Sequence, residues 1–180
     1  MILLFNKPYR VISQFSPAGD KRTLNEFIDI KHVYAAGRLD YESEGLMLLT
    51  DDVKLQARLT SPESRKYKTY LVQVEGEPDR KAIMRLQRGV ELKEGRSLPA
   101  RVKKIDPPDW LWERDPPVRY RQHIPTSWLE IQIREGKNRQ VRRMTAAVGY
   151  PTLRLIRTGI DEWDLQGLQP GEYKIIQDQK

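Results

Sequence analysis

A series of short apolar segments, joined by connections too short for parallel crossovers, constrains the fold of this chain most strongly. Neighbouring parallel strands need a crossover of a dozen or more residues, whereas antiparallel strands can follow each other after a tight turn. The patterning predicts strands over 2–5, 11–15, 46–49, 66–76, 90–92, 99–105, 128–134, 153–157 and 173–176. Helical spacing is less extensive and predicts a helix opening at Thr23 and helices over 54–59, 78–86 and 138–148. We therefore predict an α+β protein with a mainly antiparallel, mixed sheet flanked by helices and loops.

The chain contains 180 residues, which is enough for one substantial core, and we predict a single domain over residues 1–180. This length leaves room for a sheet of two lobes with a cleft between them. Residues 106–126 form an irregular segment with five prolines and two tryptophans, predicted to be a long ordered loop. Its Trp110 and Trp112 either contact a ligand or close the core beneath the loop.

Composition narrows the class of protein. There are 32 lysines and arginines against 25 acidic residues, so the net charge is +7 and the pI is near 9.6. A surplus of this size favours a polyanionic partner, although ordinary solvated surface would also account for it. The lack of cysteine excludes disulfides, thiolate nucleophiles and cysteine-bound metals. No run approaches the roughly 20 apolar residues of a membrane span, and the apolar N-terminus is too short for a signal peptide, so we predict a cytoplasmic protein.

Basic residues concentrate between Arg134 and Arg157, where seven arginines and lysines face a single acid, Glu135. Helical spacing places Val141, Met144 and Val148 on one side of the helix and Arg139, Arg142 and Arg143 on the opposite side. Like charges four residues apart repel, so we expect phosphates or a buried carboxylate to offset them. A solvated basic face is the alternative.

The stretch "SRKYKTYL", residues 64–71, interleaves basic and aromatic residues. In a strand, Lys66, Lys68 and Tyr70 share one face and Tyr67 lies on the other. Cations beside an aromatic ring suit a stacked nucleic-acid base with its phosphates nearby. Because tyrosine is common in strands, an ordinary structural role is the alternative.

The stretch "AAGRLDYESEGLMLLTDD", residues 35–52, places Asp40 two residues after Arg38. Taken alone, Asp40 is either a carboxylate that pairs with Arg38 and caps the loop or a reactive group. Other site patterns are absent, because the sequence has no phosphate-binding glycine motif and no local catalytic triad. His32 and His123 lack metal-like spacing, so no metal site is predicted.

Four blocks together resemble the RsuA-type RNA pseudouridine synthases. They are "NKPYRVISQF", "AAGRLDYESEGLMLLTDD", "KTYLVQVEG" and "EGKNRQVRRMTAAVGYPTLRLIR", in the order and at the spacing of that family, and the similarity runs from Leu3 to Tyr173. The resemblance implies the pseudouridine synthase fold and an enzyme that breaks the N1–C1′ bond of a uridine in RNA. It implies that the base then rotates and is rejoined through C5, with no metal and no organic cofactor.

The resemblance also implies roles for individual residues. Asp40 would be the essential catalytic group, Tyr70 would stack on the flipped base, and Arg142 would pair with the aspartate. Whether Asp40 attacks the base or the sugar, or acts chiefly on a glycal-like intermediate, stays open. Arg38 could also keep Asp40 ionised. The expected RNA contacts are Arg38, Arg65, Lys66, Lys68, Lys137, Asn138, Arg139 and Arg143.

The implied partner is 23S ribosomal RNA or a large-subunit assembly intermediate, because the blocks are most similar to those of a large-subunit member. Many relatives carry a small N-terminal RNA-binding domain of the S4 kind, whereas this sequence starts with the first catalytic block. We therefore expect site selection to involve the 106–126 loop, through Trp110, Trp112, Arg119 and Arg121. A monomer is expected. The alternative function is a non-catalytic ribosomal RNA-binding or assembly factor on the same fold.

Overall fold

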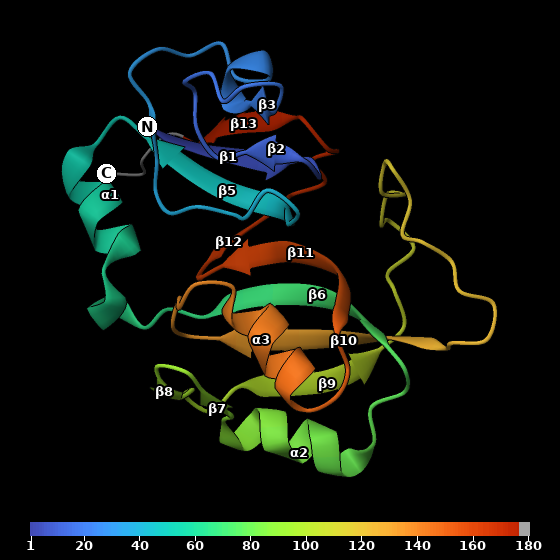
Figure 1. Ribbon diagram of the computed structural model, residues 1–180. Coiled ribbons are helices and arrows are strands. Elements are labelled where there is room, and N and C mark those ends of the chain that lie inside the picture. The colour runs from blue at the N-terminus through green and yellow to red at the C-terminus, as the bar shows by residue number, and fades with distance from the viewer. Residues whose placement is uncertain (177–180) are drawn as a thin grey trace. The chain divides into compact units, whose positions relative to one another are not determined.

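The computed structural model describes residues 1–176, which form two compact units (Figure 1). Unit 1 contains Met1–Arg65 together with the chain from Arg157 onward, and unit 2 contains Lys66–Ile156. Strand β11, Thr152–Ile160, belongs partly to each unit. The assignment of residues 1–180 to one catalytic domain stays a prediction.

Unit 1 is organised around strands that pair antiparallel in the order β13-β1-β5, with β4 also pairing with β5. Their bounds are β1 Ile2–Lys7, β4 Tyr34–Ala35, β5 Glu44–Thr50 and β13 Tyr173–Ile176. Every residue of β1 and β5 is buried, as expected for continuous apolar runs. The register pairs Leu4 with Leu48 and Lys7 with Gly45, so the end of β1 lies beside the start of β5.

The smaller elements of unit 1 are β2 Val11–Ile12, β3 Arg22–Thr23, η1 Leu24–Glu26, α1 Val53–Thr60, η2 Pro62–Ser64 and β12 Trp163–Asp164. The predicted helix at Thr23 is wrong, because the structure has only a short 3-10 turn whose Thr23 makes no capping hydrogen bond. The Glu26 carboxylate accepts from the Arg22 guanidinium at 2.8 Å. The helix predicted over 54–59 is confirmed as α1, and the Asp52 side chain caps its start by accepting from the Lys54 and Leu55 amides.

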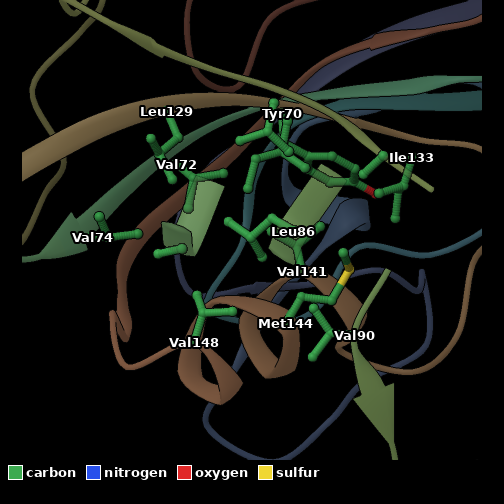
Figure 2. Packing of buried hydrophobic residues seen from close by; sticks show 14 of the residues in the cluster. Tyr70, Val72, Val74, Leu86, Val90, Leu129, Ile133, Val141, Met144 and Val148 are labelled. Carbon is green, nitrogen blue, oxygen red and sulfur yellow. The ribbon is translucent and has the colours of Figure 1, made fainter. Parts of the chain in front are cut away.

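Unit 2 has an antiparallel sheet in the order β6-β10-β9, with two helices and a small hairpin. The bounds are β6 Lys68–Glu75, α2 Arg80–Arg88, β7 Glu91–Leu92, β8 Gly95–Arg96, β9 Arg101–Ile105, β10 Thr126–Ile133 and α3 Gln140–Ala147. Figure 2 shows the core, in which Val72, Leu129 and Ile133 from the sheet pack with Leu86 and Met144 from the helices. The α+β prediction with mainly antiparallel pairing is confirmed.

Both helices of unit 2 begin later than predicted. Helix α2 starts after Asp79, whose side chain accepts from the Ala82 amide, rather than at Pro78. Helix α3 starts at Gln140, and Arg139 before it adopts a left-handed conformation with φ of 51°. The predicted apolar face of α3 is confirmed, because Val141, Met144 and Val148 are all buried.

The 106–126 segment contains no helix or strand before β10 begins at Thr126. Arginines hold it in place: Arg154 donates to the Trp112 carbonyl at 2.9 Å, and Arg114 donates to the Leu153 carbonyl at 3.3 Å. Trp110 is 54% exposed and its ring centroid lies 6.1 Å from that of the half-buried Trp112. Neither tryptophan belongs to the hydrophobic core of unit 2, so the loop is ordered without closing that core.

Among residues 1–176, no helix has the length and hydrophobicity to cross a lipid bilayer.

Candidate active site

The segment that carries Asp40 is an irregular connection fixed by side-chain and backbone hydrogen bonds within unit 1. The buried Ser13 hydroxyl donates to the Leu39 carbonyl at 2.6 Å and accepts from the Leu39 amide at 3.1 Å. The Leu39 side chain is buried in the unit 1 core. Asp40 itself is half-buried, and its carbonyl accepts from the Ser43 amide at 3.0 Å. A single serine therefore pins both polar backbone groups of the residue immediately before Asp40.

Two glycines allow the chain to enter and leave this segment. Gly37 has φ of 94°, a conformation that costs glycine nothing but strains other residues. Gly45, with φ of 109°, begins the return into β5 and lies against the Arg157 backbone, where an added Cβ would collide with the Arg157 carbonyl. The glycines of the "GRLDYESEG" block thus meet local steric requirements.

A buried group of charged residues lies beside the Asp40 segment. Lys7 is fully buried, and Glu44 and Arg157 are buried as well. The Lys7 ammonium donates to the Pro8 and Val11 carbonyls at 2.8 and 2.9 Å. Arg157 Nε donates to the Leu46 carbonyl at 2.9 Å, which connects this cation to β5.

Burial controls the ionisation of Lys7. Removal from water lowers the pKa of Lys7 to about 7, with the Arg157 charge lowering it further, while the carboxylates of Glu44 and then Asp40 raise it. Asp40 therefore shares an electrostatic environment with a lysine that can change its charge near neutral pH. Nothing in the sequence pattern marked Lys7 as buried, and we did not single it out.

Arg38 does not pair with Asp40. The Arg38 residue is exposed and forms no ion pair or hydrogen bond within residues 1–176. The interpretation of Asp40 as one half of a local Arg38 salt bridge is therefore wrong. An exposed guanidinium next to Asp40 is available to a ligand, which keeps the predicted RNA contact open.

Tyr70 lies on β6 opposite Ile131 of β10 and is 8% exposed. Figure 2 shows it in the unit 2 core with Ile133 and Val141. Tyr70 points into this core, whereas β6 begins at Lys68, so Lys66 and the half-buried Tyr67 lie before the strand and the predicted alternation does not extend to them.

A carboxylate relieves the predicted repulsion on helix α3. Arg143 Nη1 lies 2.6 and 2.8 Å from the two carboxylate oxygens of Glu94, and this hydrogen bond lowers the pKa of Glu94. Arg139 is the N-cap residue of the helix, and its carbonyl accepts from the Arg143 amide at 3.1 Å. Arg142 is half-buried on α3. A carboxylate therefore offsets the charge of Arg143, but the expected buried carboxylate is not the one found, because Glu94 is exposed.

The remaining predicted RNA contacts differ in exposure. Arg65, Lys66, Asn138 and Arg139 are exposed, whereas Lys68 and Lys137 are half-buried. The Lys137 ammonium lies 3.9 Å from the Glu135 carboxylate.

The sequence reading missed a cation pair around Tyr67. The guanidinium carbons of Arg101 and Arg134 lie 4.1 and 5.9 Å from its ring centroid. Arg101 lies on β9, more than 30 residues after Tyr67 in the sequence, so local sequence patterns could not predict this contact.

The structure places the proposed residues in different units. Asp40, Arg38 and Arg65 belong to unit 1, and Tyr70, Arg142 and the other predicted contacts belong to unit 2. The catalytic and RNA-binding roles stay predictions. In residues 1–176, no group of three or more histidines, cysteines or acids is arranged to hold a metal ion.

Comparison with known proteins defines the class. The family model for RNA pseudouridylate synthase matches residues 1–147, and the chain belongs to this family. The resemblance to RsuA-type enzymes and the prediction of an RNA pseudouridine synthase are thereby confirmed.

Individual relatives are more specific. The chain is 56% identical over 176 residues to "Ribosomal large subunit pseudouridine synthase E" of Vibrio parahaemolyticus, covering 98% of this chain and 74% of the relative. It is 55% identical to the protein of the same name in Xanthomonas campestris, covering 97% and 95%. Among solved structures, a pseudouridylate synthase crystal structure matches with a TM-score of 0.80 and 28% identity, covering 98% of this chain and 70% of that one. The pseudouridine synthase fold prediction is confirmed.

Proposed function

We propose that this chain isomerises a uridine of large-subunit ribosomal RNA to pseudouridine, with Asp40 as the catalytic group. The observation that carries the substrate is the Xanthomonas campestris relative, which aligns over nearly its whole length and is named for the large ribosomal subunit. The firmly held Asp40 segment supports the catalytic assignment, because a reactive carboxylate must be kept in one geometry.

The reaction is an isomerisation, so atoms and charge balance within the nucleotide. The N1–C1′ bond breaks, the base turns, and a C5–C1′ bond forms while C5 loses a proton and N1 gains one. Asp40 acts as the nucleophile that holds the intermediate, and either the base or C1′ is a suitable electrophile. Tyr70 stacks on the base, and Arg142 keeps the carboxylate ionised.

Access to the uridine requires its extrusion from the RNA stack. Exposed cations at Arg38, Arg65, Lys66 and Arg139 then hold the neighbouring backbone, which positions the RNA without selecting a sequence. The exposed Trp110 of the 106–126 loop, together with Arg119 and Arg121, is suited to reading unpaired bases.

The test compares wild-type protein with Asp40→Asn on large-subunit ribosomal RNA transcribed in vitro, which contains no pseudouridine. Carbodiimide modification and primer extension map the product. We expect one new stop with wild type and a fall of at least about a thousandfold in rate with Asp40→Asn, at nearly unchanged RNA affinity. Asp29→Asn, which removes an exposed carboxylate from the same unit, is the control and should behave as wild type.

Full activity of Asp40→Asn would overturn the catalytic assignment. Tight, salt-sensitive binding without product, on both naked RNA and isolated large-subunit precursors, would instead support a non-catalytic assembly factor. Product only on the precursors would identify an assembly intermediate as the substrate. We further propose that the protein acts as a monomer in the cytoplasm, where such precursors mature, which sedimentation and fractionation can test.

A further inference from the structure

Two exposed cations, Arg10 and Lys21, form cation–π contacts with tyrosine rings directly beside the Asp40 segment. The Arg10 guanidinium carbon lies 5.2 Å from the Tyr9 ring centroid, and the Lys21 ammonium lies 4.8 Å from the Tyr41 ring centroid. Tyr41 follows Asp40 in the chain. Both cations belong to unit 1, as does Asp40, and neither belongs to the basic clusters that the sequence analysis identified.

The backbone connects these residues to Asp40. The Arg10 amide donates to the Tyr41 carbonyl at 2.8 Å, which fixes the turn after Pro8 against the residue next to Asp40. Arg10 has φ of 61°, the left-handed conformation that residues with a Cβ rarely adopt. A glycine would occupy this position without strain, so an arginine here suggests that its side chain contributes an interaction that offsets the strained backbone.

The two charges lack acidic partners. No ion pair joins Arg10 or Lys21 to a carboxylate within residues 1–176, and both residues are exposed. A cation stacked on a ring is restricted in direction, while its N–H groups remain available to an incoming acceptor. Phosphate oxygens are the acceptors that suit both a guanidinium and an ammonium.

We infer that Arg10 and Lys21 bind the sugar–phosphate backbone immediately beside the uridine that reaches Asp40. This inference rests on the proposed function and deepens it, because it assigns the residues that hold the reacting nucleotide from unit 1. Tyr9 and Tyr41 direct the cations. The two cations are RNA-positioning residues, since they contact the backbone rather than the base.

The test uses Arg10→Gly and Lys21→Met, with Lys31→Met as the control for loss of one exposed charge in the same unit. Glycine tolerates the φ of Arg10, so that variant removes the side chain without straining the turn. The probe is large-subunit ribosomal RNA transcribed in vitro. Both RNA binding and pseudouridine formation are measured between roughly 50 and 300 mM salt, because binding through phosphate contacts weakens strongly over about this range.

Each variant should weaken RNA binding and raise KM about tenfold at low salt, as expected for one charge-assisted contact, with kcat changed by less than about twofold. The slope of log K against log salt should fall by about 0.7–0.9 for each lost phosphate contact. Lys31→Met should change neither quantity by more than about twofold.

Unchanged affinity and salt slope in both variants would overturn the inference, as would a loss of kcat at constant KM. A loss equal to that of Lys31→Met would also overturn it, because the effect would then be nonspecific. If wild type formed no pseudouridine on this RNA or on isolated large-subunit precursors, the proposed function would fail, while the binding measurements would still judge whether Arg10 and Lys21 contact phosphate.

Discussion

Replacement of the buried Lys7 by methionine should remove a specific pH dependence of stability. In the folded protein the pKa of Lys7 is about 7, whereas the pKa of a lysine in the unfolded chain is about 10.4. Between these values the unfolded chain binds one more proton than the folded protein. The free energy of unfolding therefore rises with pH across this window, and the slope disappears below about pH 7, where both states are protonated.

The size of the effect follows from the two pKa values. One proton corresponds to about 1.4 kcal/mol per pH unit, and the slope is only partly developed at pH 7, where folded Lys7 is half protonated. From pH 7 to pH 9 wild-type protein should gain about 2 kcal/mol from this group. Lys7→Met should lose that gain, and Lys54→Met, which removes an exposed lysine from α1, should keep it.

The assay is urea unfolding at pH 7, 8 and 9 for all variants. Replacement of Lys7 also changes the charge around the buried Glu44, whose carboxylate raises the pKa of Lys7. The double variant Lys7→Met/Glu44→Gln removes both charges and isolates the lysine term. Titration of wild-type protein carrying ¹³C-labelled lysine should show one side chain with a midpoint near 7.

Equal slopes for wild type and the double variant, together with no lysine titrating below about pH 9, would refute this reasoning. Such a result would mean that Glu44 and Asp40 stabilise a fully charged Lys7 more strongly than burial destabilises it.

Two further substitutions test how the Asp40 segment is held. Ser13→Ala leaves the buried amide and carbonyl of Leu39 unpaired, so the free energy of unfolding in urea should fall by about 2–3 kcal/mol and pseudouridine formation should fall as well. The control Ser16→Ala, at an exposed serine, should lower the free energy of unfolding by less than about 0.5 kcal/mol. Gly45→Ala places a Cβ against the Arg157 backbone of β11 and should lower the free energy of unfolding by about 3 kcal/mol or more. Gly19→Ala, at a glycine with positive φ but open space around it, should lower it by only about 1 kcal/mol. Similar losses for the two variants would mean that the positive φ alone, and not the contact with β11, causes the effect.

Local patterns predicted the elements that depend on local causes. Continuous apolar runs identified β1 and β5, because strands buried on both faces leave few polar positions. Helical spacing identified the buried face of α3 for a similar reason. The helix predicted at Thr23 is only a short 3-10 turn, in which Glu26 binds Arg22, a contact that the spacing of the segment did not indicate.

Contacts between distant residues could not be predicted in this way. Arg143 and Glu94 are 49 residues apart, and charge spacing on the helix indicated only that some anion was needed. Lys7 is harder still, because lysine is usually exposed and its burial depends on how β1 meets β5. For the candidate site, the family blocks pointed to Asp40 and also contain Ser13, but the spacing of the blocks did not reveal that the Ser13 hydroxyl binds the Leu39 backbone.

The buried lysine and the exposed arginine of this site have a common structural cause. The turn after β1 places Arg10 in a left-handed conformation, and the carbonyls of Pro8 and Val11 on either side of it accept hydrogen bonds from Lys7. Methionine could fill the volume of the lysine, but it would leave both carbonyls without their partner. Because the Arg10 amide binds the Tyr41 carbonyl, the same turn is also attached to the residue after Asp40. A single buried ammonium thus supports both the candidate phosphate contact at Arg10 and the position of the candidate catalytic carboxylate, which accounts for retaining a charge where an apolar side chain would be easier to bury.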